Sequence, residues 1–433
     1  MIRKIFANGT DENAFFKELE KRNGETDKKV TEIVNGIIED VRENGDSAVN
    51  KYTEKFDGKL PQYFEVPREV INDALTEADQ KFVDALLNSM ENITDFHKRQ
   101  VEQGFITPKE NGVILGQRIR GLERVGLYVP GGTAAYPSSV LMNAIPAKIA
   151  GVKEIIMVTP PLKDGTPNKD ILVAAAVCGV DRIFLSGGAQ AVAALAYGTE
   201  SIPKVDKIFG PGNQYVMAAK QLVSLSDVAI DMPAGPSEVE VLADETANPS
   251  FVAADLLSQA EHGADSQVVL ISTSREMLKA VQSEVERQLE TLPRKEIAAK
   301  ALSHSLAVLV KDINDAISVT NDYAPEHLVI AVKNYREVAK HIRHAGSVFL
   351  GSYSCESAGD YASGTNHTLP TKGYARAYGG LCLDCFVRKM TLQELSPEGV
   401  REIGPAVMAM AAGEQLEAHK RAMEIRLDSL KQK

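Results

Sequence analysis

A chain of 433 residues exceeds the roughly 150 residues of a typical single domain, so we expect two or three domains that share a sizeable core. Its 44% hydrophobic and 25% charged residues are typical of a globular protein and exclude an intrinsically disordered one. The formal net charge of -11, without a long block of Lys and Arg, argues against a protein that binds nucleic-acid phosphates.

Neither a targeting segment nor a membrane span is predicted. Residues 1–9 lack the apolar stretch of a secretory signal, and the apolar run 171–180 is only about half of a membrane span. With no membrane or nucleic-acid partner indicated, we expect a cytoplasmic protein.

The first 110 or so residues show helical periodicity, with Ile33, Ile37 and Val41 spaced to line one face of a helix. From Gly112 onward, short apolar runs alternate with longer amphipathic segments, which is the rhythm of βα units with parallel sheets. The segment 397–430 is helical again. The predicted strands are 126–129, 154–158, 182–185, 207–209, 239–242, 268–271, 306–310 and 347–350.

We therefore predict an α/β fold with two Rossmann-like parallel-sheet domains and small helical N- and C-terminal segments. Residues 1–25 are expected to form the N-terminal segment and residues 382–433 the C-terminal tail. A first α/β domain would be discontinuous, from 26–127 and 237–381, with a second α/β domain inserted at 128–236. The turn formers at 232–237 are expected to mark the crossing between the two.

Three glycine turns follow predicted strands, at 128–132, 186–190 and 209–213. Ligands bind beyond the carboxyl ends of parallel strands, where glycine lets the backbone approach a phosphate. The repeated turns therefore suggest a dinucleotide site. None is a G-x-G-x-x-G, and a steric role for each single turn is the alternative.

Polar side chains that could hold a metal gather in two segments. Gln259 and His262 lie three residues apart on a helix that ends at Gly263, so both project from one face. A long polar loop after the strand 347–350 adds Glu356, Asp360 and His367 as candidate ligands or bases. The alternative for His262 is an interaction with the C-terminal dipole of its own helix.

Two further acid and imidazole combinations are candidates for proton transfer or binding. Glu326 and His327 are adjacent after Pro325, which suits proton transfer, although a surface pair is the alternative. In the tail, Glu414 and His419 lie five residues apart, about 140° around a helix, so they would contact a ligand only from two sides.

The four cysteines are too few for a disulfide scaffold. Cys382 and Cys385 form a lone C-x-x-C motif without a second pair. We expect these two side chains to serve packing, with a metal or redox site as the less favoured interpretation.

Taken in order along nearly the whole chain, these motifs resemble the histidinol dehydrogenase family. The segments that carry the resemblance are YVPGG at 128–132, SGGAQ at 186–190, FGPGN at 209–213, AGPS at 234–237, QAEHG at 259–263, APEHL at 324–328, AGDY at 358–361, and Glu414 with His419.

The resemblance implies oxidation of L-histidinol through its aldehyde to L-histidine with two NAD, the last two steps of histidine biosynthesis. It implies Zn²⁺ held in the discontinuous domain, proton removal by a histidine, water activation by a glutamate, and a homodimer in which each tail completes the partner's site. The residues assigned are Gln259, His262, Asp360 and His419 to zinc; Glu326 and His327 to catalysis; Tyr128, Gln190 and Asn213 to NAD; and Ser237, Gln259, His262, His327, Asp360, Glu414 and His419 to substrate.

Three alternatives remain open from the residues alone. A relative that oxidises another small alcohol, such as a sulfonated diol, would share the same cofactors. A zinc hydrolase could use the same zinc, glutamate and histidine without a dinucleotide. A non-enzymatic nucleotide-binding module would leave the Gln-x-x-His and Glu-His pairs unexplained.

Overall fold

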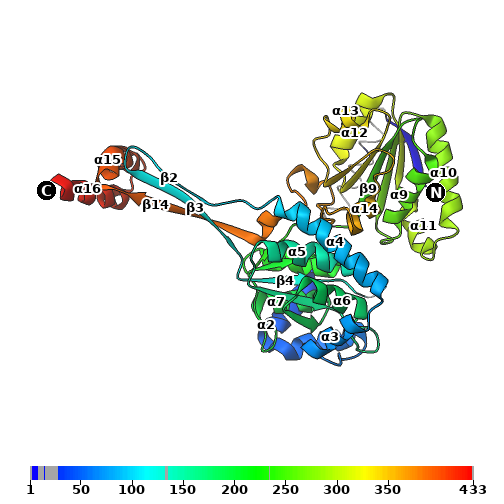
Figure 1. Ribbon diagram of the computed structural model, residues 1–433, viewed down its shortest axis with the longest axis horizontal. Helices are drawn as coiled ribbons and strands as arrows, with labels where there is room; N and C mark the ends of the chain where they lie inside the picture. The colour runs from blue at the N-terminus through cyan, green and yellow to red at the C-terminus, as the bar shows by residue number, and fades with distance from the viewer. Residues whose placement is uncertain (1, 8–13, 15–27, 132–134, 234, 432–433) are drawn as a thin grey trace.

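The computed structural model describes residues 2–7, 14, 28–131, 135–233 and 235–431. Two parallel sheets with helices on both faces form the body of the molecule, and a long antiparallel ribbon extends from it (Figure 1). None of the helices in the described ranges has the length and apolar character that crossing a bilayer requires.

The first sheet has five parallel strands in the order β6-β5-β4-β7-β8. Its strands read as nearly continuous apolar runs because both faces are buried, as in Glu154–Thr159. The strands are β4 (Arg124–Tyr128), β5 (Glu154–Thr159), β6 (Arg182–Leu185), β7 (Lys207–Phe209) and β8 (Ala229–Ile230).

Two apolar clusters cover the faces of this sheet. One contains side chains from α3, α4, α5 and α6, and the other contains side chains from α2, α7 and α8. The helices are α2 (Lys28–Asp57), α3 (Arg68–Thr76), α4 (Gln80–Lys98), α5 (Pro137–Ile149), α6 (Lys169–Cys178), α7 (Gly188–Tyr197) and α8 (Gln214–Ser224).

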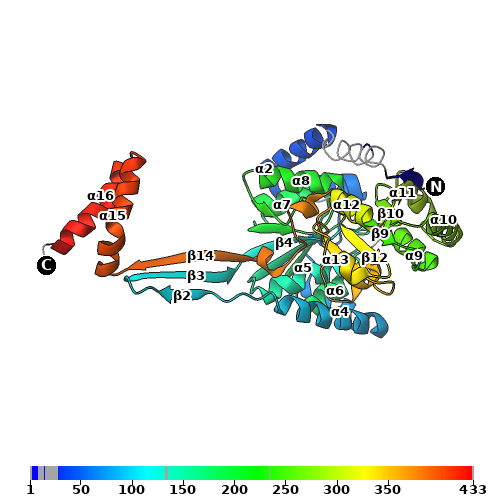
Figure 2. The same ribbon diagram turned by 90° about the horizontal axis from the view of Figure 1, so that it is seen from above.

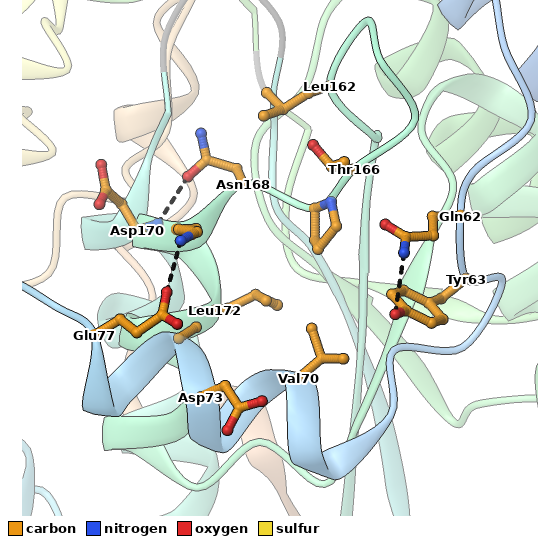
Figure 3. A pocket seen from close by; sticks show the side chains of 13 residues that line it. Gln62, Tyr63, Val70, Asp73, Glu77, Leu162, Thr166, Asn168, Asp170 and Leu172 are labelled. Carbon is orange, nitrogen blue, oxygen red and sulfur yellow. Dashed lines mark hydrogen bonds and ion pairs between the residues drawn. The ribbon is translucent and has the colours of Figure 1, made fainter.

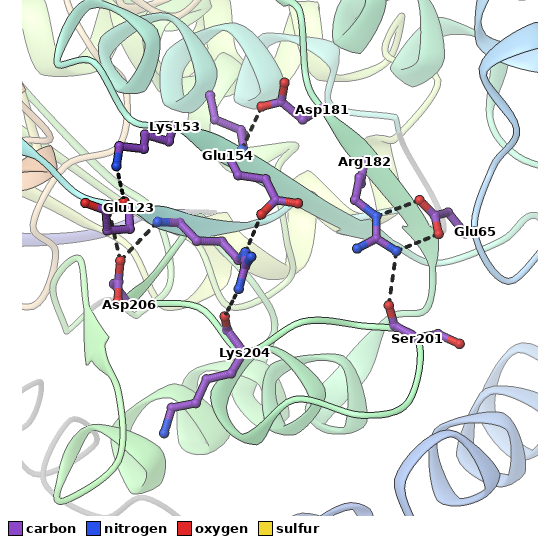
Figure 4. A network of polar contacts seen from close by, with 11 residues as sticks. Glu65, Glu123, Lys153, Glu154, Asp181, Arg182, Ser201, Lys204 and Asp206 are labelled. Carbon is purple, nitrogen blue, oxygen red and sulfur yellow. Dashed lines mark hydrogen bonds and ion pairs between the residues drawn. The ribbon is translucent and has the colours of Figure 1, made fainter.

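Charged residues close the amino edge of the five-stranded sheet (Figure 4). Arg182, the first residue of β6, donates two hydrogen bonds of 2.7 Å to Glu65, and Arg124, the first residue of β4, pairs with Glu154, the first residue of β5. These partly exposed pairs occupy the amino ends of the strands.

The second sheet has six parallel strands in the order β1-β11-β10-β9-β12-β13. Apolar clusters on its two faces include α9, α10 and α11 on one side and α12 and α13 on the other. The strands are β1 (Arg3–Phe6), β9 (Glu238–Ala243), β10 (Gln267–Ser272), β11 (Leu306–Leu309), β12 (His327–Ala331) and β13 (Ser347–Leu350). The helices are α9 (Pro249–Ala260), α10 (Arg275–Leu289), α11 (Lys295–Ser303), α12 (Ile313–Tyr323), α13 (Tyr335–Ala339), α14 (Glu356–Tyr361) and the 3₁₀ turn η1 (Tyr374–Arg376).

The ribbon is a three-stranded antiparallel sheet in the order β14-β3-β2, formed by β2 (Phe105–Pro108), β3 (Val113–Gly121) and β14 (Val387–Leu395). It carries α15 (Pro397–Gly413) and α16 (Glu417–Lys431) at its far end, away from both parallel sheets (Figures 1 and 2). We call residues 105–121 and 387–431 the arm.

Hydrogen bonds from the segment after α14 connect the two halves of the body. Asn366 donates to the Met142 carbonyl of α5 at 2.7 Å, and Asn92 of α4 donates to the Ala362 carbonyl at 2.8 Å. This segment therefore lies between the five-stranded sheet's helices and the six-stranded sheet.

The α/β prediction with parallel sheets is confirmed, and each predicted strand is present with its ends within two residues of the expected ones. The turn formers at 232–237 separate β8 from β9, although Ala234 lies outside the described residues.

The structure differs from the expected domain division in three places. Residues 26–127 were grouped with 237–381, but α2, α3 and α4 pack on helices of the five-stranded sheet, and β4 begins at Arg124 within that sheet. Residues 3–6 form a strand paired with β11, whereas most of the predicted helical segment 1–25 lies outside the described residues. The expected helical tail 382–433 begins with the 3₁₀ turn η2 (Leu383–Phe386) and strand β14, which pairs antiparallel with β3, and becomes helical only after them.

Candidate active site

The predicted catalytic pair lies at the amino edge of the six-stranded sheet. His327 is the first residue of β12, Glu326 directly precedes it, and Ser237 directly precedes the neighbouring strand β9. Pro325 and the left-handed Ala324 end α12 and turn the chain into β12, so the pair is fixed at the strand's start.

The two side chains are buried and held by the backbone of β9. The Nδ1 atom of His327 lies 3.1 Å from the Glu238 carbonyl oxygen, so Nδ1 donates there and Nε2 is the atom left for chemistry. The Oε2 atom of Glu326 accepts the Glu238 N–H at 2.8 Å and lies 3.7 Å from His327 Nδ1. The backbone of Glu238 therefore holds one polar atom of each side chain, and His327 Nε2 and the second carboxylate oxygen of Glu326 are left to contact a ligand.

Three metal-type ligands converge beside this pair. One ligand atom each from His262, Glu356 and Asp360 lie within 4.8 Å of one another. His262 follows the carboxyl end of α9, while Glu356 and Asp360 are on one face of α14 and are buried. Asp360 Oδ1 also lies 3.5 Å from His327 Nε2, longer than a good hydrogen bond, so the carboxylate oxygen keeps bonding capacity.

Gln259 completes the cluster from α9 and is fully buried. In the orientation that satisfies both groups, its amide nitrogen donates to the Glu356 carboxylate, with one contact at 3.2 Å. The carboxamide oxygen of Gln259 is then free for a cation. One imidazole nitrogen, one amide oxygen and two carboxylates form a donor set that a divalent metal can accept.

The pKa values show an excess of acidic groups at this site. Burial alone would lower the pKa of His327, but the carboxylates of Glu356, Glu326 and Asp360 outweigh it and raise that pKa to about 10. Burial raises the pKa of Glu326 to about 7 and also raises that of Glu356. Burial acts to raise the pKa of Asp360, but contact with His327 lowers it overall. Such a cluster favours binding of a cation.

His367, the remaining candidate of the polar loop, is near the same carboxylate. Burial lowers the pKa of His367, while the charge of Asp360 acts in the opposite direction. The three candidates of this loop, Glu356, Asp360 and His367, therefore lie near one another.

The predicted NAD residues lie in the other half of the body, at the carboxyl edge of the five-stranded sheet. Tyr128 ends β4, and its hydroxyl accepts the Gly188 N–H at 3.1 Å. Asn213 is the N-cap of α8 and accepts the N–H groups of Tyr215 and Val216. Both side chains therefore stabilise helix N-termini at strand ends, where an anionic ligand is favoured.

Gln190 in α7 is buried, and neither of its side-chain polar atoms has a hydrogen-bond partner within the described residues. A buried amide without partners costs free energy unless a ligand or water satisfies it. Of the first glycine turn, Gly132 lies outside the described residues.

Sequence reasoning missed a buried ion pair behind the third glycine turn. Lys220 Nζ contacts Asp231 Oδ1 at 2.6 Å and donates to the Gly210 carbonyl at 2.7 Å, while Asp231 Oδ2 accepts the Gly210 N–H at 2.8 Å. Gly210 has φ 108° and packs on the Tyr128 backbone so closely that a Cβ would collide with its carbonyl. The available signal was a lysine within the apolar helix 214–224.

Two buried glutamates of β9 were also missed. Burial raises the pKa of Glu240 to about 8, and burial together with the nearby charge of Glu326 raises the pKa of Glu238 to about 8. Glu240 accepts the Thr320 hydroxyl, and Glu238 accepts the Lys372 N–H at 3.1 Å. The alternating acids of the sequence EVEV at 238–241 were the signal, since acids within a buried strand need partners.

Glu414 and His419 are not brought to the cluster within one chain. Glu414 is the C-cap of α15 and His419 lies in α16, both exposed at the far end of the arm (Figure 2). Within a single chain, the cluster is therefore formed without them.

A separate cavity of about 550 Å³ lies between α3, the loop before it and the start of α6 (Figure 3). It is lined by Tyr63, Val70, Asp73, Leu162 and Asn168, among others, and by none of the predicted site residues. The proposed NAD and metal residues therefore do not form this cavity.

Comparisons with known proteins agree with this arrangement. The family model described as histidinol dehydrogenase matches residues 20–427. The histidinol dehydrogenase of Bacteroides thetaiotaomicron is 56% identical over 414 residues, covering 96% of this chain and 97% of that protein. The chloroplastic histidinol dehydrogenase of Arabidopsis thaliana is 51% identical over 403 residues, covering 92% and 86%.

A solved structure is similar over the whole length, arm included. The crystal structure of histidinol dehydrogenase from Elizabethkingia anophelis has a TM-score of 0.92 and 45% identity, covering 99% of both chains. On the family match and these identities, the chain belongs to the histidinol dehydrogenase family.

Proposed function

We propose that this chain oxidises L-histidinol through its aldehyde to L-histidine, with Zn²⁺ at the amino edge of the six-stranded sheet and two NAD as oxidants. The observation that carries the proposal is the cluster in which the accessible His262 and the buried Glu356 and Asp360 adjoin the buried Glu326 and His327 pair. Metal-type ligands beside an acid-base pair suit oxidation of an alcohol that is itself a metal ligand.

Gln259, His262 and Asp360 would hold the zinc, and Glu356 would orient Gln259 through its amide. When bound, Zn²⁺ supplies a positive charge that ligates and orients the imidazole and amine nitrogens of the substrate. The acidic cluster fits this charge because Asp360 Oδ1 has no hydrogen-bond partner within the described residues. Ser237, at the start of β9, would contact the substrate from the same edge.

His327 is proposed to remove the hydroxyl proton of the substrate at Nε2, because a bound cation would offset the carboxylate charges that raise its pKa and so free the imidazole to accept a proton. The Glu238 carbonyl fixes the ring through Nδ1, so Nε2 faces the Asp360 side, where the substrate would lie. Glu326 is proposed to activate water for attack on the aldehyde through the carboxylate oxygen that the Glu238 N–H does not occupy. The aldehyde hydrate formed in this way carries the proton and the hydride that would be lost in the second oxidation.

Tyr128, Gln190 and Asn213 are proposed to bind NAD, which accepts the hydride in each oxidation. Gln190 supports this assignment because its buried amide lacks partners within the described residues. Tyr128 and Asn213 mark the carboxyl ends of β4 and β7, where backbone amides of the following helices suit a pyrophosphate.

Glu414 and His419 are proposed to act in trans, in a homodimer. The arm carries both residues away from the body of their own chain, so they complete a site only on another copy. His419 would be the fourth zinc ligand and Glu414 a substrate contact. The cytoplasmic location stays a prediction.

The test of the reaction is the number of NADH formed for each L-histidinol consumed with Zn²⁺ present. Two NADH support the four-electron oxidation. One NADH, or none, contradicts it, and the absence of NADH would leave a zinc hydrolase with a different substrate as the alternative.

The test of action in trans is co-expression of His262→Ala with His419→Ala. In a mixed dimer whose arms act in trans, one site collects both defects and the other is intact, so two inactive parents give an active hybrid. Arms that act in cis leave one defect in every site, and a verified heterodimer without activity would contradict the proposal.

A further inference from the structure

The C-x-x-C motif lies where the arm joins the body, outside both edges described above. Cys382 precedes the 3₁₀ turn η2 (Leu383–Phe386), which contains Cys385 and leads directly into β14. The proposed function uses neither thiol.

The two sulfur atoms face each other. The Sγ atoms of Cys382 and Cys385 are 3.9 Å apart, and the Cys385 N–H donates to the Cys382 carbonyl at 3.1 Å. This i to i+3 hydrogen bond winds the segment at three residues per turn, which places side chains i and i+3 on the same side. A disulfide bond of about 2.05 Å therefore requires only that side-chain rotation bring the sulfurs about 2 Å closer.

The surroundings of the pair distinguish one reactive thiol from its neighbour. Both residues are half-buried, so solvent reaches the pair. The Cys385 thiol and the backbone N–H groups of Asp384 and Cys385 lower the pKa of Cys382 to about 6, while contact with Cys382 raises that of Cys385. A thiolate that is accessible and next to a second thiol is the arrangement of a redox-active dithiol.

We propose that Cys382 and Cys385 are a redox-active dithiol that a low-molecular-weight disulfide, such as oxidised glutathione, converts reversibly to a disulfide. The Cys382 thiolate attacks one sulfur of the oxidant, forming a mixed disulfide and releasing one thiolate. Cys385, after losing its proton to solvent, attacks Cys382 Sγ and releases the second thiolate. The protein loses two electrons and two protons, and the oxidant becomes two thiols.

The bonds around the motif connect it to the five-stranded sheet. Phe386 is fully buried and stacks on Phe209 with ring centroids 4.1 Å apart, and Lys207 donates to the Cys385 carbonyl at 3.0 Å. The Leu383 N–H donates to Gln100 at 2.9 Å. These contacts hold η2 in place in both redox states, so closing of the disulfide is a local change at the root of the arm.

The experiment incubates the full chain in glutathione buffers of increasing oxidised fraction, followed by acid quenching, alkylation and mass spectrometry. We expect loss of two alkylatable thiols and two hydrogens, confined to the peptide that contains Cys382 and Cys385, with reversal by dithiothreitol. Cys178 and Cys355 serve as internal controls that stay alkylatable. Reduced protein should also be alkylated at Cys382 about tenfold faster near pH 6 than an ordinary cysteine thiol.

Two serine variants test the order of attack. Cys385→Ser should accumulate a stable glutathione adduct at Cys382, whereas Cys382→Ser should show neither adduct nor disulfide at this peptide. Wild-type protein that resists oxidised glutathione, or that accumulates adducts without the internal disulfide, would overturn the proposal. Because the readout is thiol chemistry, failure here leaves the proposed oxidation of histidinol untouched.

Discussion

The two parallel sheets carry the proposed site residues at opposite edges. The five-stranded sheet presents its carboxyl edge, where Tyr128, Gln190 and Asn213 are uncharged and helix N-termini begin. The six-stranded sheet presents its amino edge, where Glu326 and His327 adjoin a cluster of carboxylates. If the proposed sites are right, the rule that ligands bind beyond the carboxyl ends of strands applies to only one of the two sheets.

This difference separates two kinds of chemistry. The carboxyl edge suits an anionic dinucleotide because backbone amides and helix dipoles face it. At the amino edge, α9 and α12 end next to the cluster, and buried side chains supply the charge. We therefore expect the proposed cofactor site and the proposed metal and proton-transfer site to respond separately to substitution, and the predictions below test that separation.

Removal of the metal should have the largest effect, and only at the amino edge. A chelator should abolish activity, while circular dichroism and the unfolding transition stay nearly unchanged, because the apolar clusters of both sheets form without the proposed ligands. Readdition of Zn²⁺ should restore activity. Unfolding of the chelated protein would show that the metal holds the fold together.

Glu326→Gln should slow oxidation of supplied histidinal by about 10²- to 10⁴-fold, and oxidation of histidinol to the aldehyde much less. The amide keeps the size of the side chain but cannot take a proton from water. The matched variant His327→Gln should slow both half-reactions. Equal losses in the two half-reactions of Glu326→Gln would remove the division of roles between the neighbours.

Lys220→Met tests the carboxyl edge and should destabilise the fold by about 3–5 kcal/mol, because Asp231 would stay buried without its partner. The unfolding free energy in urea measures this loss. Lys340→Met is the matched control, since the Lys340 and Glu337 pair is 65% and 69% exposed and should contribute less than about 1 kcal/mol. Similar losses of stability for both variants would contradict the conclusion that Lys220 stabilises a buried Asp231.

Glu240→Gln should change how stability depends on pH. Burial raises the pKa of Glu240 to about 8, so the folded state keeps a proton that the unfolded state releases, and stability falls as pH rises from about 5 to about 8. The variant should reduce this slope by about 1 kcal/mol per pH unit, measured by urea unfolding at several pH values. The exposed Glu245→Gln should leave the slope unchanged; a slope unaffected by Glu240→Gln would mean that Glu240 is ionised.

Gln190→Met should give the smallest change in stability, a gain of up to about 1 kcal/mol, because it removes a buried amide without partners. The same variant should raise the KM for NAD while leaving Zn²⁺ affinity unchanged. A loss of stability together with an unchanged KM would show that the amide serves the fold and not the cofactor.

The buried strands of the parallel sheets were easier to predict from the sequence than the exposed strands of the arm. Strands such as 154–158 and 268–271 are apolar on both faces, so their composition alone indicates a parallel sheet covered by helices. The arm strands β3 and β14 are mostly partly or fully exposed and pair across more than 250 residues, so no local signal indicates their partner. The helices before residue 100 were assigned to the wrong sheet because amphipathic periodicity does not identify the surface that a helix covers.

The candidate site was predictable in its members but not in its placement. The motifs around Gln259, Glu326 and Asp360 indicated a metal and an acid-base pair, and the structure brings these segments together. Their location at the amino edge follows from the chain turning at Pro325, and nothing in the spacing indicates which edge is used. Lys220 and Glu240 were missed because a single charged residue within an apolar segment does not show whether it is buried with a partner.

The pairing of β3 with β14 sets how the arm can change length between relatives. The strands pair residue by residue from Val113 with Leu395 to Gly121 with Val387. A strand advances about 3.3 Å per residue, and a shift of one residue turns every side chain to the opposite face. Insertions that preserve the orientation of α15 and α16 must therefore occur in both strands together and in even numbers. Two residues added to each strand would move those helices outward by about 7 Å.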